Sequence, residues 1–474
     1  MTALENFFEF IKGKKIALLG LGISNIPLID FLLSHGAEVS AHDKKDRSGF
    51  DAAFMEELDK KGVRLFLGGT YLDEFDEDII IKAPGIRRDH PSLLQAEKRG
   101  ALLTSEMEFF FKVSPCEKFA VTGSDGKTTT TTLIYLMLSE QYKDTNRNVY
   151  VGGNIGKPLL SHVEEMKPDD IAVLELSSFQ LHAMAVAPSG AVITNVSPNH
   201  LDWHTDYEEY IDSKKRIFSF MQNGTVVLNY QNEITRSMAE EGPDGCTVRF
   251  FTSGDPSTIP EAYTVVYKKD GKIFVRDADT RKSVCIMDTS DILLPGDHNI
   301  ENYMTAIALL YGRVECSVFV KIAKTFGGVE HRCEFIREKD GVKYYNSSID
   351  SSPSRTMAAL KAFKDKKVIA VMGGYDKHIP YDVMGDCVCE HTRAVILTGA
   401  TAEKIRDAIT GCESAKTQLP ELHMVDDFTD AVNFARSIAH EGDIVILTPA
   451  SASFDKFKNF EERGNLFRSI VRGF

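Results

Sequence analysis

The sequence predicts an α/β protein with more than one domain. Apolar runs typical of buried strands lead into glycine-rich turns and then into helix-like segments, and this order recurs along the chain. At 474 residues the chain is too long for a single hydrophobic core, so roughly two to four domains are expected. A content of 43% hydrophobic and 26% charged residues is typical of a water-soluble globular protein.

The charge balance and the N-terminus exclude several classes of function. The formal net charge of −14 comes from 55 basic and 69 acidic residues, with no basic block. Because nucleic-acid binding needs a Lys/Arg surface that neutralises phosphates, no nucleic-acid partner is expected. No run approaches the roughly 18 apolar residues of a membrane span, and MTALENFFEF has acidic residues where a signal peptide has basic ones. We therefore expect a cytoplasmic protein with no membrane partner.

The cysteines do not suggest a metal site. Only Cys387 and Cys389 are close in sequence, and a single C-x-C lacks the second pair that a zinc site needs. We expect isolated thiols at all eight positions: Cys116, Cys246, Cys285, Cys316, Cys333, Cys387, Cys389 and Cys412.

The first hundred residues predict a dinucleotide-type fold with an altered fingerprint. The run KIALLG (15–20) predicts a strand, GLGISN a turn, residues 26–34 a helix and AEVSAHD a second strand. The glycines and Asp43 fit the signature in which the backbone approaches a pyrophosphate and an acid binds a ribose, but Asn25 replaces the third glycine. An NAD-dependent oxidoreductase and a related site for a different nucleotide both remain open.

The same alternation continues to a predicted boundary near residue 104. VRLFLGG and DIIIKAPGI predict strands, PSLLQAEKRG predicts a helix, and the run DEFDED (73–78) predicts a solvated loop. Ser105 and Glu108 form a capping-box pattern before the helix-like EMEFFFKV, which indicates where the next domain begins.

The strongest motif is VTGSDGKTTTT, residues 121–131. An apolar strand precedes it and a helix-like segment follows, so backbone N–H groups and a helix N-terminus face a phosphate chain. Lys127 would reach the terminal phosphates and the Thr128 hydroxyl would bind Mg²⁺. The general pattern G-x-x-x-x-G-K-[ST] needs a glycine where this chain has Val121. The residues expected at the nucleoside triphosphate are Gly123, Ser124, Asp125, Gly126, Lys127, Thr128 and Thr129.

Polar clusters follow each of the next apolar strands. GGNIGKP stands at 152–158, IAVLE (171–175) runs into LSSFQL, and AVITN runs into VSPNHLDWH. The carboxyl ends of parallel strands are where ligands of α/β sheets bind. Glu175 is therefore a candidate second carboxylate for nucleotide-bound Mg²⁺, and His200 a candidate metal or substrate contact.

Lys214 is predicted to face inward. In the helix predicted over 207–221, the helical repeat places Lys214 on the apolar side, whereas Lys215 and Arg216 fall off it. Desolvation lowers the pKa of such an amine, which can then pair with a carboxylate or add CO₂ to become an anionic carbamate. The apolar stripe consists of Tyr207, Tyr210, Ile211, Ile217, Phe218 and Met221.

Residues 222–290 predict strands and turns at the rim of the central domain, and we assign them no chemistry. In the helix predicted from PGDHNIENY, Asn299 and Asn302 are three residues apart and share one face, where two amides can bind a base.

The C-terminal part predicts a second doubly wound α/β unit. Arg332, Lys377 and Ser453 follow strand ends there and can form a cationic pocket for a small carboxylate and a phosphate. The predicted strands are 366–374, 393–399 and 443–450, and the predicted helices are 403–410 and 428–439.

Together these motifs resemble the ATP-dependent Mur ligases of peptidoglycan precursor synthesis. The phosphate-loop and HNxxN elements are shared across that family, whereas SSFQL and SFDKFKNFEERG resemble its glutamate-adding member. The resemblance covers nearly the whole chain, through GLGISN, TGSDGKTT, GGNIG, LELSSFQL, SPNHLD, the K-x-R-I after it, HNxxN, EHR, GGYDK and PASASFDKFKNFEERG.

The resemblance implies three domains. These are a Rossmann-like UDP-binding domain (1–104), a P-loop ATPase-like central domain that binds ATP (105–330) and a Rossmann-like amino-acid-binding domain (331–474). It implies ATP and Mg²⁺ as cofactors, and UDP-N-acetylmuramoyl-L-alanine and D-glutamate as substrates joined through an acyl phosphate. We expect a monomer.

The resemblance also implies the site residues. Lys127, Glu175, His200 and Lys214 would be catalytic, with Thr128, Glu175, His200 and a carbamylated Lys214 as the metal ligands. The remaining implied contacts are Ser24, Asp43, Asn154 and Ser177 for the UDP substrate, Asn299, Asn302 and Arg332 for ATP, and Lys377, Ser453, Phe454 and Phe460 for glutamate.

One segment departs from the family pattern. Where such ligases usually read N-D-S-K-A-T, this chain reads N-S-S-I-D-S from Asn346. The usual acid and lysine are replaced by Ser347 and Ile349, and an acid appears at Asp350. Our hypothesis is that Asp350 substitutes for the missing acid in ATP binding.

Three alternatives stand beside this interpretation. A nucleotide switch is suggested by N-H-L-D at 199–202, which is similar to a guanine-reading N-K-x-D with His200 in place of the lysine. An NAD oxidoreductase requires the first domain to bind a dinucleotide. A folate-type polyglutamyl ligase is closer, but the extra N-terminal domain and the C-terminal run disfavour it.

Overall fold

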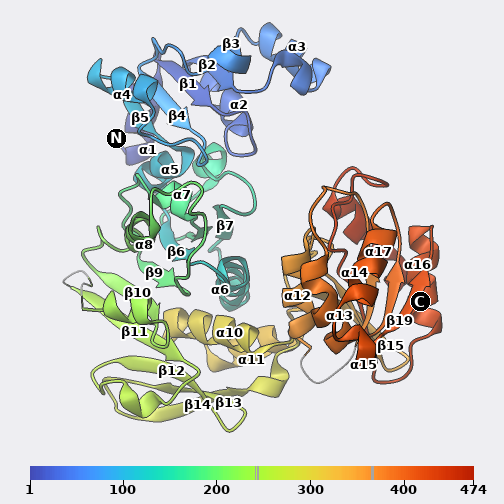
Figure 1. Ribbon diagram of the computed structural model, residues 1–474. Coiled ribbons are helices and arrows are strands. Elements are labelled where there is room, and N and C mark those ends of the chain that lie inside the picture. Colours follow the sequence, from blue (N-terminus) through green and yellow to red (C-terminus); the bar gives the residue numbers. More distant parts are fainter. Residues whose placement is uncertain (241, 243–244, 364–367) are drawn as a thin grey trace. The chain divides into compact units, whose positions relative to one another are not determined.

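The computed structural model of the chain falls into two compact units. It describes residues 1–240, 242, 245–363 and 368–474. The first unit comprises residues 1–286 and 302–319, and the second comprises 287–301 and 320–474. No helix within these described residues is both long and apolar enough to cross a bilayer. Figure 1 labels many of the helices and strands of each unit.

The first unit begins with a five-stranded parallel sheet in the order β3-β2-β1-β4-β5 (blue in Figure 1). The order reverses between β1 and β4, so the loops after β1, β2 and β4 share the edge at which such sheets bind ligands. The predicted Rossmann-like topology is therefore confirmed. The strands are β1 Lys15–Leu19, β2 Glu38–Asp43, β3 Arg64–Leu67, β4 Ile79–Lys82 and β5 Leu102–Thr104.

The helix that follows Ser105 begins where the sequence predicts. Ser105 accepts a hydrogen bond from the Glu108 N–H at 3.2 Å, as the capping-box pattern requires. The Glu108 carboxylate instead accepts from the Thr104 hydroxyl at 3.4 Å, so only half of the predicted box forms. The helices are α1 Ala3–Ile11, α2 Ile26–Ser34, α3 Ala52–Lys60, α4 Pro91–Lys98 and α5 Glu106–Val113.

Asn25, the residue in place of the third fingerprint glycine, has a structural role. Its side chain is buried, and its Nδ2 donates to the carbonyl oxygens of Leu19 (3.1 Å) and Gly20 (3.0 Å). These carbonyls lie at the end of β1, where the Leu19 carbonyl also accepts from the Ala83 N–H at 2.8 Å. The altered fingerprint therefore stabilises the turn before α2.

The interpretation of residues 73–78 as a solvated loop is wrong in part. The segment has no regular structure, but Phe75 and Glu77 are buried. The Glu77 carboxylate accepts from the Ser40 hydroxyl at 2.5 Å and from Arg64 Nη2 at 2.9 Å. Contacts from distant strands give this acid partners that its acidic neighbours in sequence do not indicate.

The central part of the first unit is built on a nine-stranded sheet, in the order β14-β13-β12-β11-β10-β9-β6-β8-β7. Neighbours from β7 through β12 pair in parallel, and β13 is antiparallel to β12. Residues 222–290 are thus not confined to the rim, because β10 and β11 lie inside the sheet. The strands are β6 Glu117–Thr122, β7 Val149–Gly153, β8 Ile171–Glu175, β9 Gly190–Ile193, β10 Gly224–Asn229, β11 Cys246–Thr252, β12 Thr264–Lys269, β13 Lys272–Arg276 and β14 Ser283–Asp288.

The helix predicted over 207–221 is shorter than expected. It ends at Lys215, and the chain continues in turns that still bury Ile217, Phe218 and Met221. The apolar stripe was therefore identified correctly although its helical extent was not. The helices of this part are α6 Lys127–Tyr142, α7 Ser178–Leu181, α8 Tyr207–Lys215, α9 Glu233–Ser237, α10 Asp297–Leu310 and α11 Cys316–Thr325.

One hydrophobic core runs through both sheets of the first unit. It includes apolar side chains of α1, β1 and α2 together with those of α5, β8 and β10. The rings of Phe7 in α1 and Phe109 in α5 are 4.9 Å apart. The N-terminal sheet is thus packed onto the central part, across the predicted boundary near residue 104.

The second unit has a six-stranded sheet in the order β15-β16-β20-β17-β18-β19. Only the β15/β16 hairpin is antiparallel among these neighbours, and that hairpin and α17 were not predicted. The predicted strand 366–374 corresponds to β17, and its first two residues lie outside the described part. The elements are β15 Glu334–Lys339, β16 Val342–Asn346, α12 Pro353–Lys361, β17 Val368–Met372, α13 Gly385–His391, β18 Thr392–Leu397, α14 Ala402–Gly411, α15 Ala415–Gln418, β19 Glu421–Met424, α16 Phe428–Ser437, β20 Ile444–Leu447 and α17 Phe460–Arg472.

Replacing Asn25 tests its structural role. Asn25→Gly recreates the dinucleotide fingerprint but removes the side-chain hydrogen bonds to the Leu19 and Gly20 carbonyls, so the free energy of unfolding should fall by about 1–3 kcal/mol. Urea denaturation measures this change. Ile23→Ala in the same turn is the control, because Ile23 is 80% exposed. Equal stability of Asn25→Gly and the unaltered protein would contradict the role.

Candidate active site

Two positions in the loop between β6 and α6 can be occupied only by glycine. Gly123 (φ 149°) and Gly126 (φ 80°) have backbone angles that side-chain-bearing residues rarely adopt. A Cβ on Gly123 would collide with the Thr194 hydroxyl, and one on Gly126 with Asn302 Oδ1. Val121 is a buried residue of β6, paired with Glu175 of β8, so the turn is shorter than the general pattern. This close approach of bare backbone is what a phosphate-binding loop requires.

Side chains from neighbouring strand ends hold the loop in place. The Asp125 N–H donates to Asn195 Oδ1 at 3.0 Å. The buried Ser124 hydroxyl bonds the Ser197 carbonyl (3.0 Å) and the Tyr210 hydroxyl (2.9 Å). Sequence reasoning did not identify Tyr210 in this role, although it lies on the predicted apolar stripe of α8.

Lys127 lies at the start of α6, as predicted. The Lys127 ammonium donates to the Gly123 and Ser124 carbonyls, at 3.0 Å each. Asn302 Oδ1 accepts from the Thr130 hydroxyl at 3.2 Å, which brings α10 against α6. Thr128 and Thr129 occupy the first turn of α6. Asn299, in the same helix as Asn302, belongs to the second unit, and its Nδ2 donates to the Pro295 carbonyl at 2.7 Å.

Lys214 is buried against the phosphate loop, which confirms its predicted inward position. The side chain is 1% exposed, and its Nζ donates to the Gly123 carbonyl at 2.6 Å. The Tyr210 ring lies 4.5 Å from the same nitrogen. Burial, helped by the positive charge of Lys127, lowers the pKa of the Lys214 amine to about 6. At neutral pH the amine is therefore largely uncharged and nucleophilic.

Glu175 presents a carboxylate oxygen that has no hydrogen-bond partner among the residues that the structure describes. It ends β8 with 1% of its surface exposed, and its Oε1 accepts from Asn154 Nδ2 at 2.7 Å. Its Oε2 is buried without any hydrogen bond. A buried ionised oxygen without a partner is unfavourable, and carboxylate oxygens are preferred ligands of Mg²⁺. This atom therefore fits a cation.

His200 lies in the loop after β9, in the left-handed backbone region (φ 56°). Its ring lies 4.8 Å from that of Phe179 in α7. The pKa of His200 is lowered by partial burial and by the positive charges of Lys127 and Lys214. A neutral imidazole can act as a metal ligand or a hydrogen-bond partner of substrate.

Ser177 has a local structural role, which the sequence analysis did not predict. It caps α7, accepting from the Gln180 N–H at 3.3 Å while its own N–H donates to Gln180 Oε1 at 2.9 Å. This capping box fixes the segment SSFQL directly after Glu175.

Ser24 and Asp43 lie at the carboxyl ends of β1 and β2, which are neighbours in the N-terminal sheet. The Asp43 carboxylate accepts from the backbone N–H groups of Leu21 (2.7 Å) and Lys45 (2.9 Å). The predicted uridine-diphosphate residues therefore share one edge of the sheet.

In the second unit, the loops after β17 and β20 meet. The Tyr375 N–H donates to the Ala452 carbonyl at 2.8 Å, which joins the loop of Lys377 to the loop of Ser453 and Phe454. Ser453 is buried, whereas Lys377 and Phe454 are exposed. Arg332 is also exposed, and the next residue towards the N-terminus, His331, contacts the Phe460 ring at 5.9 Å.

Arg463 in α17 was missed. Its buried guanidinium donates to the carbonyls of Ser348 (2.9 Å), Ser451 (3.1 Å) and Ala452 (3.0 Å). It therefore ties the segment after β16 to the loop after β20. The sequence did contain a signal for Arg463. It lies four residues before the buried Phe467 and so shares a helix face with it, just as Lys214 shares the apolar stripe of α8.

Asp350 lies in a buried cluster of hydroxyl groups. It is 5% exposed, and its Oδ2 accepts from the Thr448 hydroxyl at 2.9 Å. Burial raises the pKa of Asp350 to about 6. Its carboxylate is thus hydrogen-bonded within the second unit.

A metal ion at Glu175 would need ligands of several kinds. Among the described residues, no group of three or more His, Cys, Asp or Glu side chains lies close enough to hold an ion. The expected set of Thr128, Glu175, His200 and carbamylated Lys214 includes a hydroxyl and a modified amine, and the unpartnered Glu175 oxygen fits it.

Family models match all three regions of the chain. The descriptions are Mur ligase MurD-like N-terminal domain for residues 14–105, Mur ligase middle domain for 121–310, and Mur ligase glutamate ligase domain for 331–451. Together they span more than half of the sequence. The chain belongs to the Mur ligase family.

Curated relatives match this Mur ligase over nearly its whole length. A UDP-N-acetylmuramoylalanine–D-glutamate ligase from Clostridium novyi is 46% identical over 98% of both chains. The enzyme of that name from Acetivibrio thermocellus is 48% identical over 99% of this chain and 98% of its own. Family membership sets aside the oxidoreductase and the guanine-nucleotide switch.

Solved Mur ligases share the fold. UDP-N-acetylmuramate–alanine ligase MurC from Thermotoga maritima aligns with a TM-score of 0.57, at 18% identity over 97% of this chain and 99% of its own. MurF ligase from the same organism, solved in complex with ADP, aligns with a TM-score of 0.52, at 18% identity over 98% and 97% of the two chains.

The lowered pKa of Lys214 predicts a pH-dependent stability. The unfolded lysine, with a pKa near 10.5, binds more protons than the folded one between about pH 6 and 10.5, so stability rises with pH across this window. Lys214→Met removes this dependence. The free energy of unfolding of Lys214→Met should exceed that of the unaltered protein, and this difference should shrink by up to about 1.4 kcal/mol per pH unit as the pH rises.

Urea denaturation in CO₂-free buffers at pH 6.5, 7.5 and 8.5 measures this difference. Lys215→Met, one residue further along α8 and off the buried stripe, is the matched control for loss of a lysine. Parallel pH profiles of Lys214→Met and the unaltered protein would refute the lowered pKa.

Proposed function

We propose that this Mur ligase joins the carboxylate of UDP-N-acetylmuramoyl-L-alanine to the amine of D-glutamate, with conversion of ATP to ADP and phosphate. The observation that carries the proposal is the near full-length identity of 46–48% to enzymes named for this reaction. The same relatives disfavour a folate-type polyglutamyl ligase. The product is a cytoplasmic precursor of peptidoglycan.

The phosphate loop supports the activation step. A carboxylate is a poor electrophile, so ATP first transfers its terminal phosphoryl group to it, giving an acyl phosphate and ADP. Phosphoryl transfer depends on positioning and on neutralisation of charge. Lys127, held at 3.0 Å from two loop carbonyls, exchanges these for phosphate oxygens when the nucleotide enters. Asn299, Asn302 and Arg332 bind the rest of the nucleotide.

Lys214 supplies an anionic ligand after modification. Its neutral amine attacks CO₂, a new N–C bond forms, and the released proton passes to solvent, which leaves a carbamate. Thr128, Glu175, His200 and carbamylated Lys214 would hold Mg²⁺, which neutralises the transferring phosphoryl group. Asn154 keeps one oxygen of Glu175 occupied and so directs the other to this position.

The two substrates bind to different domains. Ser24 and Asp43 in domain 1–104 bind the uridine diphosphate, while Asn154, Ser177 and His200 in domain 105–330 approach the muramoyl-alanine end. In domain 331–474 the glutamate contacts are Lys377, Ser453, Phe454 and Phe460. The glutamate amine attacks the acyl phosphate, a tetrahedral intermediate forms and phosphate leaves. The enzyme acts as a monomer.

The reaction is tested by phosphate release with ATP, Mg²⁺ and UDP-N-acetylmuramoyl-L-alanine against a panel of amino acids of both configurations. We expect release only with D-glutamate, in equal amount to the amide product. Lys214→Ala should lower turnover at least about 100-fold, because the anionic ligand is lost. Equal use of L-glutamate, or near-normal turnover of Lys214→Ala, would contradict the proposal.

Asp350 is tested separately as the substitute acid for ATP binding. Asp350→Ala and Asp350→Asn should both raise the KM for ATP about tenfold, the effect of losing one charged hydrogen bond. Because Asn can still accept from Thr448, only Asp350→Ala should also lower stability. An unchanged KM for ATP in both variants would refute the substitution, whatever their stability.

A further inference from the structure

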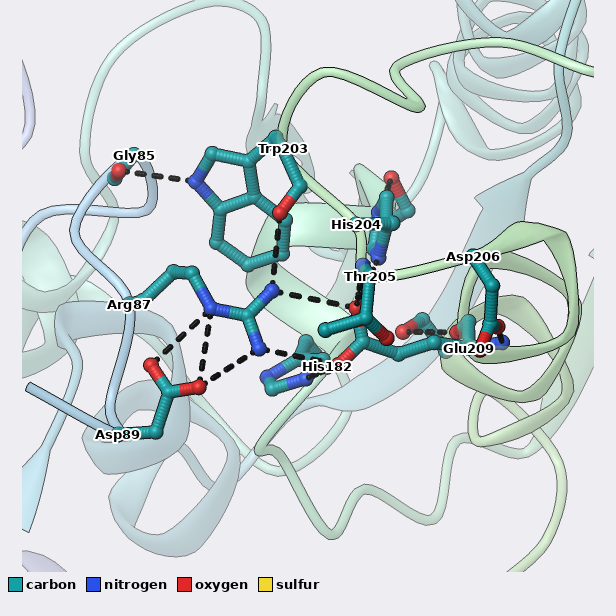
Figure 2. Close-up of polar contacts among 11 residues, drawn as sticks. Gly85, Arg87, Asp89, His182, Trp203, His204, Thr205, Asp206 and Glu209 are labelled. Carbon is teal, nitrogen blue, oxygen red and sulfur yellow. Dashed lines mark hydrogen bonds and ion pairs between the residues drawn. The ribbon is translucent and has the colours of Figure 1, made fainter.

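A network of polar contacts centred on Glu209 joins two domains of the first unit (Figure 2). The Glu209 carboxylate, at the start of α8, accepts both Nη atoms of Arg87, at 3.0 and 3.2 Å. It also accepts from the Thr205 N–H at 2.9 Å, and His182 and His204 lie 3.0 and 3.2 Å from it. The Arg87 hydrogen bonds, more than any other contact, hold the pKa of Glu209 well below its usual range.

Arg87 carries this network into the N-terminal domain. It follows β4, where the loop lies at the ligand-binding edge of the first sheet. Its guanidinium also bonds Asp89 and donates to the Trp203 carbonyl at 2.9 Å. In return the Trp203 indole N–H donates to the Gly85 carbonyl at 3.0 Å, and the guanidinium lies 4.9 Å from the indole ring. Contacts thus run in both directions between residues 85–89 and 203–209.

Glu209 also orients the turn that carries His200. His204 is buried, and its Nε2 lies 3.0 Å from the Ser178 hydroxyl while its Nδ1 faces Glu209. The N–H of His204 donates to the His200 carbonyl at 3.0 Å. The position of His200 therefore depends on that of His204, and the position of His204 on Glu209.

The side chains of Ser178, His204 and Glu209 contact one another in series, in the order of a nucleophile, a base and an orienting acid. Ser178 is only 2% exposed, in the first turn of α7, so no substrate reaches its hydroxyl. This series of contacts instead links α7 to the turn that carries His200. Helix α7 follows Glu175 and is capped by Ser177. The arrangement of these contacts is suited to positioning and not to covalent catalysis.

We propose that Arg87 and Glu209 are positioning residues of the ligase, which fix the His200 turn and the SSFQL helix against the loop after β4. We call the set Arg87, Trp203, His204 and Glu209 the strap. The inference rests on the proposed function, because the acceptor substrate binds to both domains that the strap connects. Through the His200 turn and the SSFQL helix, the strap acts on the residues proposed to approach the acceptor, and none of its four members belongs to the phosphate loop.

The test compares steady-state kinetics of Arg87→Ala and Glu209→Gln with the unaltered protein. Misplacing His200 and Ser177 should raise the KM for the UDP-linked acceptor and lower kcat, so that kcat/KM for the acceptor falls about 10- to 100-fold. The KM for ATP should stay within about twofold, since the strap lies outside the phosphate loop. Arg87→Lys should give an intermediate loss, because lysine cannot bond Glu209 through two nitrogens.

Two neighbours serve as matched controls. Arg88→Ala removes an adjacent arginine that pairs with Glu97, and Glu208→Gln changes an adjacent exposed acid of α8. Both should retain the acceptor KM. A role limited to stability would lower the melting temperature and the active fraction of the strap variants while leaving their KM values unchanged, and that result would refute the positioning role.

Trp203 reports on the strap directly, because it is the only tryptophan of the chain. Its emission should shift to longer wavelength, and its quenching by acrylamide should increase, in Arg87→Ala but not in Arg88→Ala. Unchanged acceptor kinetics of Arg87→Ala and Glu209→Gln would overturn the inference, and so would unchanged fluorescence of Arg87→Ala. Absence of ligation by the unaltered protein would instead refute the proposed function, and the strap inference with it.

Discussion

The active-site architecture depends on two lysines that share one acceptor. The Gly123 carbonyl receives hydrogen bonds from Lys127 at 3.0 Å and from Lys214 at 2.6 Å. Burial, together with the positive charge of Lys127, lowers the pKa of the Lys214 amine. The same contact gives the two amines different chemistry, one suited to phosphate binding and one to reaction with CO₂.

This arrangement is possible because the loop has no side chain at Gly123 and Gly126. Thr194 follows β9 and Asn302 belongs to α10, and both lie where a side chain on Gly123 or Gly126 would be. Ser124 reaches Tyr210 of α8, so the loop, the helix of Lys214 and the end of β9 form one rigid group. Parallel pairing of β6 with β8 and β9 brings these segments to one edge of the sheet.

Departures from sequence motifs turn out to have local physical reasons. Val121, where the general phosphate-loop pattern has glycine, is a strand residue in the core, and the turn begins after it. Asn25, in place of the third glycine of a dinucleotide fingerprint, supplies donors to two buried carbonyls. Asp350 is hydrogen-bonded to Thr448 within the fold. A motif rule therefore describes the backbone that a ligand needs, while individual residues also serve the fold around it.

The sequence alone determined what depends on near neighbours along the chain. The strand and helix order, the phosphate loop, the cap at Ser105 and the inward face of Lys214 all follow from spacings of a few residues, because helix and strand periods are local. The end of α8, the burial of Glu77 and the partners of Arg463 were not accessible in this way.

Only the tertiary structure decided which distant residues meet. Thr130 and Asn302 are 172 positions apart, and Arg87 and Glu209 are 122 apart. Their contacts depend on strand order and on the packing of one sheet against another, which a hydrophobic pattern does not encode. The hydrophobic pattern of the sequence predicts that a side chain is buried, whereas the tertiary fold determines which residue it contacts.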